Sequence, residues 1–239
     1  MLALQSPTGC IITTKLIYTD TLSTMVYLAG FVVLLLFLTA EARVGNSSES
    51  TFCTETKECL LYDLVCKGDN YEVRHYSSAK WVTTDEESYF MDKAIYTAFM
   101  RLFKYINGSN NADVNIDMTA PVIIKVNEMK NMWQQSVYTL SFLLPSEHQL
   151  NPPQPTDEKV YFTDMPDMNV YVRSYGGYIL CLTAKFNSMA LQKQLDKVQA
   201  TYNKDYSYSV GYNSPMKILN RHNEVWYVVE GEPVCPASS

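Results

Sequence analysis

The chain has 239 residues, of which 47% are hydrophobic and 18% charged, and its formal net charge is −6. This balance is typical of a globular protein and excludes a disordered chain, which would lack the apolar residues that a core requires. Lys and Arg form no basic cluster, which argues against nucleic acid as a partner. The 18 tyrosines favour a strand-rich fold, because aromatic residues are enriched in strands.

The first 42 residues differ in composition from the rest. Val26 to Ala40 is an almost unbroken apolar run, and Ala40-Glu41-Ala42 has the small residues of a cleavage site. Residues 1–42 are therefore predicted to be a secretory signal peptide, and the mature chain is predicted to be secreted, without a membrane span. The alternative is a membrane anchor, but a spanning helix needs roughly 20 apolar residues, and this run is shorter.

The first half of the mature chain begins with polar residues 43–58, which predict a flexible N-terminal segment ahead of a single domain over 59–235 and a tail over 236–239. Apolar residues at three- and four-residue steps predict a helix over 87–106. Alternating or continuous apolar patterns predict strands over 71–76, 80–84, 116–126 and 137–144. A proline-rich connection follows, which cannot be a central strand.

The second half repeats this order. A strand over 170–175 shares Val-Arg-x-Tyr with the strand over 71–76, a helix is predicted over 188–202, and a closing strand over 225–229. This repetition predicts two βαββ units and an α+β fold. Two such units can close their sheets on each other, with one helix against each half. Pro121 and Pro215 are expected in equivalent turns or bulges, since proline cannot donate within a central ladder.

No common catalytic signature is present, and the three histidines, His75, His148 and His222, lie far apart in the sequence. Alternation along the strand places His75 on one face with Tyr71 and Val73. Two interpretations remain open for it. It is a half-buried histidine at the rim of the core, or it is an imidazole ligand on a mostly apolar face, as a haem iron would require.

Five blocks spread over residues 71–230 resemble the SOUL/haem-binding protein family, and within it the haem-binding protein 2 branch. The blocks are Tyr71 to Tyr76 with Ala79 to Val82, Met118 to Val122, Val172 to Tyr175, Gly211 to Pro215, and Leu219 to Arg221 with Asn223 to Trp226. The resemblance implies a twisted antiparallel β-barrel built from two βαββ repeats with two flanking helices.

The resemblance also implies a non-enzymatic protein that binds haem or another porphyrin non-covalently in a hydrophobic crevice. His75 matches the position proposed as an axial ligand in the SOUL branch, and Arg74, Lys80 and Arg173 are candidate partners for the propionates. Secretion would suit an extracellular carrier or scavenger. The alternative is a module that binds another small molecule or a protein partner, as related effector-binding barrels do. An enzyme is the third possibility, opposed only by the absence of motifs.

Secretion places the cysteines in an oxidising compartment, where pairing is expected. We predict two disulfides among Cys53, Cys59, Cys66 and Cys235, with Cys235 tied to the N-terminal group. Cys181 follows an apolar stretch and is expected to stay free. Asn46 and Asn107 begin Asn-x-Ser triplets and are candidate glycosylation sites.

Overall fold

The computed structural model describes residues 43–127 and 135–236, which belong to one compact unit, Ala42–Ser239. The predicted signal peptide lies outside the described residues, as does most of the tail. The helices are α2 (Met91–Ile106) and α3 (Cys181–Lys197), with short 3₁₀ turns η1 (Ser47–Glu49) and η2 (Ser146–His148). The strands are β1 (Val44–Asn46), β2 (Glu58–Leu60), β3 (Asp63–Lys67), β4 (Glu72–Tyr76), β5 (Ala79–Ser88), β6 (Val122–Asn127), β7 (Ser136–Leu143), β8 (Val160–Met165), β9 (Met168–Tyr175), β10 (Tyr206–Gly211) and β11 (Asn223–Val228).

Nine strands form one antiparallel sheet in the order β3-β4-β9-β11-β10-β6-β7-β5-β8. The order β5-α2-β6-β7 recurs as β9-α3-β10-β11, and the halves meet where β6 pairs with β10. The predicted α+β fold of two βαββ repeats is therefore confirmed. The sheet curls but does not close, because β3 and β8 are its two edges and do not pair within the described residues. The expectation that the two units close their sheets on each other was therefore wrong.

The equivalence of strands 71–76 and 170–175 was also wrong. β4 and β9 are neighbours in the sheet, with Glu72 opposite Val172, and the counterpart of β9 in the first half is β5. The strands β4 and β8 have exchanged places, since each precedes one repeat in the sequence but pairs with the first strand of the other. Pro121 precedes β6 and Pro215 follows β10, so both lie outside the ladders as predicted, but not at equivalent positions.

The second helix begins earlier than its apolar pattern predicted. α3 starts at Cys181, where the hydroxyl of Thr183 in the first turn accepts a hydrogen bond from the amide of the preceding Leu180 at 2.9 Å. It ends near Gln199, whose φ of 57° interrupts helical geometry. The first helix is shorter than expected, since β5 continues to Ser88 in register with β7.

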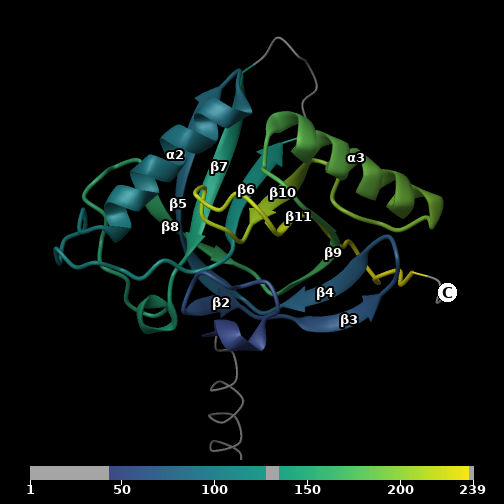
Figure 1. Cartoon of the computed structure of the whole chain (residues 1–239), viewed down its shortest axis with the longest axis horizontal. Helices are drawn as coiled ribbons and strands as arrows, with labels where there is room; N and C mark the ends of the chain where they lie inside the picture. Colours follow the sequence, from purple (N-terminus) through teal and green to yellow (C-terminus); the bar gives the residue numbers. More distant parts are fainter. Residues whose placement is uncertain (1–42, 128–134, 237–239) are drawn as a thin grey trace, which may run out of the picture. The chain divides into compact units, whose positions relative to one another are not determined.

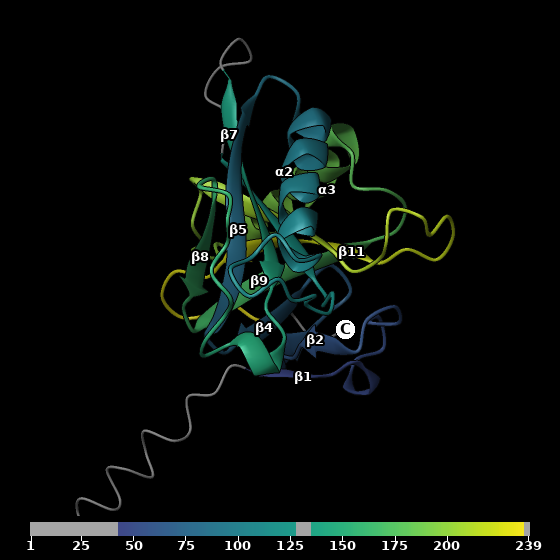
Figure 2. The same cartoon turned by 90° about the vertical axis from the view of Figure 1, so that its left-hand side faces the viewer.

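Both helices cover the same face of the sheet (Figures 1 and 2). Leu102 on α2 packs in a buried cluster with Val82 and Phe142, and Leu191 on α3 packs with Val225. None of the helices in the described residues is long and apolar enough to cross a membrane.

The opposite face of the sheet, which we call the inner face, is covered by residues 43–62. Cys53, Cys59 and Leu60 belong to its buried core, and the ring of Phe52 stacks on His222 with 4.3 Å between centroids. β1 and β2 pair within this segment. Residues 43–58, predicted to be a flexible segment, thus include a paired strand and the buried Cys53, and their flexibility stays a prediction.

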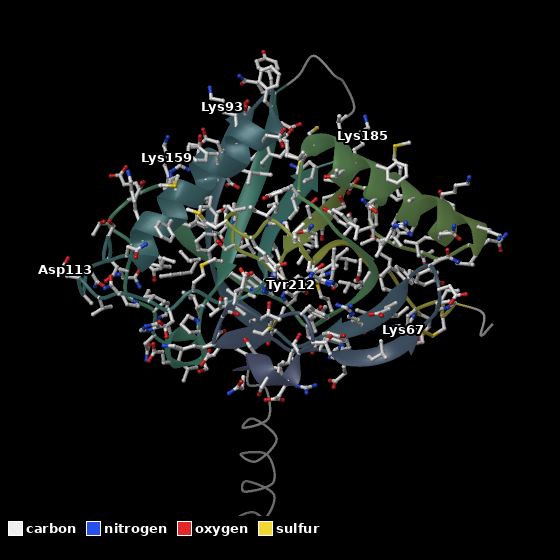
Figure 3. All side chains as sticks on the ribbon, in the orientation of Figure 1. Lys67, Lys93, Asp113, Lys159, Lys185 and Tyr212 are labelled. Carbon is white, nitrogen blue, oxygen red and sulfur yellow. A yellow bond between two sulfur atoms is a disulfide. The ribbon has the colours of Figure 1, made fainter. Side chains whose placement is uncertain are left out.

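A buried carboxylate organises the inner face. Glu224 is fully buried and accepts four hydrogen bonds, from Arg74 Nη1 at 3.0 Å, His222 Nε2 at 2.6 Å, Tyr212 Oη at 3.0 Å and Trp226 Nε1 at 2.7 Å. We call these residues, with Tyr76, the inner network; Figure 3 labels Tyr212 near the middle of the unit. Burial alone would raise the pKa of Glu224, but the His222 hydrogen bond and the Arg74 charge outweigh it and hold this pKa below its ordinary value.

Four of the five cysteines among the described residues form two disulfides, as predicted. Cys53 bonds to Cys59, and Cys66 on β3 bonds to Cys235 beyond the last strand. Cys181 is free. The second bridge closes a loop with a sequence separation of 169 and fastens the C-terminal segment to an edge strand of the sheet.

We predict that Glu224→Gln lowers the free energy of unfolding by about 3 kcal/mol, because it removes the fully buried counter-charge of the Arg74 guanidinium and leaves only Glu72 to pair with it. The pKa of Glu224 is lower in the folded protein than its ordinary value of 4.5, so the ionised carboxylate stabilises the fold fully at pH values above 4.5. This stabilisation is lost as the pH falls through the lowered folded-state pKa. The difference between wild type and variant should therefore be full at neutral pH and shrink in acid. Urea denaturation at several pH values measures it.

Glu232→Gln is the matched control, since Glu232 is exposed near the same end of the chain. A Glu224→Gln variant as stable as this control would show that the inner network does not hold the fold together.

Replacing both Cys66 and Cys235 by Ala should destabilise the chain by up to about 5 kcal/mol, the loop-closure entropy that a bridge of this span removes from the unfolded state. Cys181→Ala breaks no bridge and should change stability by much less. Both effects can be measured by denaturation without reductant. Peptide mapping that finds Cys181 in a bridge would contradict the assignment.

Candidate functional site

A hollow of about 370 Å³ lies at the ends of four neighbouring strands, where β4 and β11 end and β9 and β10 begin. Its size falls within the range of roughly 300–1,000 Å³ that is usual for small-molecule sites. We call it the His75 hollow. Its lining comprises an imidazole, two phenol rings, a thioether and several smaller groups: His75, Tyr206, Tyr208, Met168, Pro166, Asp167, Asn169, Val228 and Val229.

The imidazole of His75 is oriented by two neighbours. Nδ1 lies 3.2 Å from Oδ1 of Asn169, the residue opposite it on β9, and Nε2 lies 3.3 Å from the carboxylate of Asp167. The side chain of Asp167 is 66% exposed and so can turn away, whereas Asn169 is held in the ladder. Asn169 can thus keep Nδ1 as a donor while Nε2 is left for a ligand, which is how metal-binding histidines are usually oriented.

The walls of the hollow suit a flat apolar ligand that carries negative charge. Tyr206 and Tyr208 present aromatic rings, and Met168 and Val228 add apolar surface. The ammonium of Lys125 lies 4.1 Å from the centroid of the Tyr206 ring, so a cation stands beside the aromatic wall. An imidazole, ring surfaces and a cation are the groups that a haem iron, its macrocycle and its propionates need, so the residues present fit this group.

The other residues predicted to bind the cofactor do not gather around this hollow. Arg74 is 2% exposed and belongs to the inner network, where its charge pairs with Glu224 and Glu72. Lys80 pairs with Asp164 between β5 and β8, with 2.6 Å between the charged atoms.

Arg173 is directed towards α3, where its Nε donates a hydrogen bond to Oδ1 of Asn187 at 3.2 Å. Of the four predicted residues, only His75 lines the hollow. The roles given to the three basic residues stay predictions, and their present partners do not favour them.

A second, smaller hollow of about 120 Å³ lies between α2 and α3 over β6, β7 and β10. Met91, Tyr138 and the free Cys181 contribute to its lining. Its volume is well below the range usual for small-molecule sites. Among the described residues, no cluster of His, Cys, Asp and Glu could hold a metal ion through three or more ligands. The His75 hollow is therefore the better candidate site.

Both candidate glycosylation sites are exposed. Asn46 ends β1 and its side chain accepts a hydrogen bond from the Ser48 amide. Asn107 follows α2 and its Nδ2 donates to the carbonyl of Phe103 at 2.7 Å. Their modification stays a prediction.

Sequence reasoning did not find Asn169 and Asp167, which contact His75, or Tyr206, which lines the hollow, and Lys125, which contacts the Tyr206 ring. These residues are distant from His75 in the sequence and reach it only through pairing of β4 with β9 and of β10 with β6. A correct assignment of strand neighbours would have placed Asn169 opposite His75.

Comparisons with known proteins agree with the fold and point to a family. The human protein Heme-binding protein 2 is 40% identical over 164 residues, which cover 69% of this chain and 80% of that protein. Heme-binding protein 1 of Xenopus laevis is 32% identical over 169 residues, which cover 69% of this chain and 88% of that protein.

Among solved structures, the EcmrR C-terminal domain superposes with a TM-score of 0.52 at 8% identity, over 71% of this chain and 98% of that domain. This likeness shows a shared fold alone. The model of the family described as SOUL heme-binding protein matches residues 57–228, from β2 to the end of β11. The chain therefore belongs to the SOUL heme-binding protein family, and its stronger similarity to Heme-binding protein 2 agrees with the branch that its motifs resemble.

Proposed function

We propose that this chain is a non-enzymatic binder of haem or another porphyrin and that the ligand occupies the His75 hollow. The observation that carries the proposal is the imidazole of His75 in a hollow with an aromatic wall. The names of the related proteins and of the family support the ligand class.

In this proposal the residues of the hollow have separate roles. Haem would supply a flat apolar ring, an iron atom that takes axial ligands and two carboxylates. Nε2 of His75 would approach the iron, while Asn169 keeps Nδ1 as a donor. Tyr206 and Tyr208 would pack against the ring, and Lys125 would pair with a carboxylate. Binding would be non-covalent, because the hollow has no cysteine.

We also propose that the protein is secreted and acts as a carrier or scavenger. The apolar run over 26–40 with its cleavage pattern supports export. The two disulfides support an oxidising compartment. Immunoblotting of medium and cells after expression of the full chain tests export, and a protein confined to the cells would contradict it.

The binding proposal predicts that haem added to the purified protein produces a saturable Soret band, and that His75→Ala shifts its maximum and weakens binding at least tenfold. Metal-free protoporphyrin lacks the iron, so its affinity should fall much less in the same variant. Fluorescence quenching and absorbance titrations measure both affinities.

His148→Ala is the matched control, since His148 lies in η2, away from the hollow, and pairs with Glu147. An unchanged spectrum and haem affinity in His75→Ala would remove His75 as a ligand. A flat haem titration of the wild type would instead favour a module for another small molecule or partner.

A further inference from the structure

The exposed side of the two helices carries apolar side chains that nothing in the described unit covers. Leu182, Phe186 and Met189 lie on one stripe of α3 and are 81%, 70% and 58% exposed. On α2, Tyr96 is 69% exposed. Both helices lie on the same face of the sheet (Figures 1 and 2), so we treat their exposed side chains as one surface. We call this surface the helix layer. A soluble protein seldom leaves so much apolar surface exposed without a partner.

The helix layer is also cationic, in contrast to the rest of the chain. Of the chain's 19 basic and 25 acidic residues, α2 and α3 hold six basic and two acidic, which leaves 13 basic and 23 acidic elsewhere. The five lysines of the two helices have no ion-pair partner among the described residues: Lys93, Lys104, Lys185, Lys193 and Lys197. By contrast, the lysines at 57, 67, 80, 204 and 217 are all paired with carboxylates.

We propose that the helix layer docks on an anionic phospholipid surface. Unpaired lysines would face the headgroups, while Leu182, Phe186 and Met189 would enter the boundary of the acyl chains. A bilayer accepts protruding side chains without a complementary pocket, and the small hollow between the helices offers no deep groove for a protein segment. The net charge of −6 does not prevent this contact, because acidic groups on the far side are screened beyond about 8 Å at physiological salt.

The composition of the helix layer argues against a second copy of the chain or a nucleic acid as its partner. In a two-fold symmetric dimer the same surface would meet itself and bring lysines against lysines. A nucleic acid would satisfy the lysines but would give the exposed aliphatic side chains no apolar partner. An anionic lipid surface satisfies both kinds of side chain.

The test is co-sedimentation of the purified chain, expressed in full, with vesicles of phosphatidylcholine alone or with 30% phosphatidylserine. The wild type should bind the anionic vesicles at least tenfold more tightly, and rising salt should weaken this binding. Lys185→Glu/Lys193→Glu and Leu182→Ser/Phe186→Ser should each lower it at least tenfold. The replaced side chains are all exposed on α3, so circular dichroism should show an unchanged fold.

Lys57→Glu/Lys67→Glu is the matched control, because it changes the net charge equally but lies off the helices. Figure 3 shows Lys67 on β3, away from the labelled Lys93 and Lys185. No variant alters residues 1–42, so a difference between variants reports on the helix layer. Equal binding to both vesicle types, equal loss in the control, or a dimer in sedimentation that Leu182→Ser/Phe186→Ser abolishes would overturn the proposal.

Discussion

The structure depends on the ion pair between Glu224 and Arg74. This pair is buried on the inner face of the sheet, where apolar side chains would be usual. A buried pair is costly to desolvate and becomes tolerable only when its remaining hydrogen-bonding capacity is used. Here His222, Tyr212 and Trp226 supply the additional donors to the carboxylate. The strands β4, β10 and β11 must therefore keep the register that brings these groups together.

The inner network in turn gives the N-terminal segment its place. The guanidinium of Arg74 lies 4.1 Å from the centroid of the Tyr62 ring, and the Phe52 ring stacks on His222. The segment over 43–62 thus covers the inner face, and none of its residues lines the His75 hollow. The residues lining the His75 hollow come from strands and their connections and not from α2 or α3, so the hollow and the helix layer can be altered independently.

Much of the fold could be predicted because its signals are local. The helix at Met91, the strand at Val137 and the order of the two repeats all follow from periodicity. The neighbours in the sheet could not be predicted this way, because the exchange of β4 and β8 is a long-range pairing that leaves no local pattern. The same limit explains the site. His75 was found from its own strand, whereas Asn169 and Tyr206 reach the hollow only through strand pairing.

The disulfides show how this chain differs from the region that defines its family. The family match covers residues 57–228, so Cys53 and Cys235 lie outside it while their partners Cys59 and Cys66 lie within. Each bridge therefore fastens a flanking segment to the family fold. Covalent attachment limits the entropy that those segments can gain by leaving the sheet. Bridges of this kind persist in an oxidising compartment. The N-terminal flank thus covers the inner face, whereas the C-terminal flank packs with Tyr71 and Tyr171 on the side of α3. Neither flank contributes to the lining of the His75 hollow.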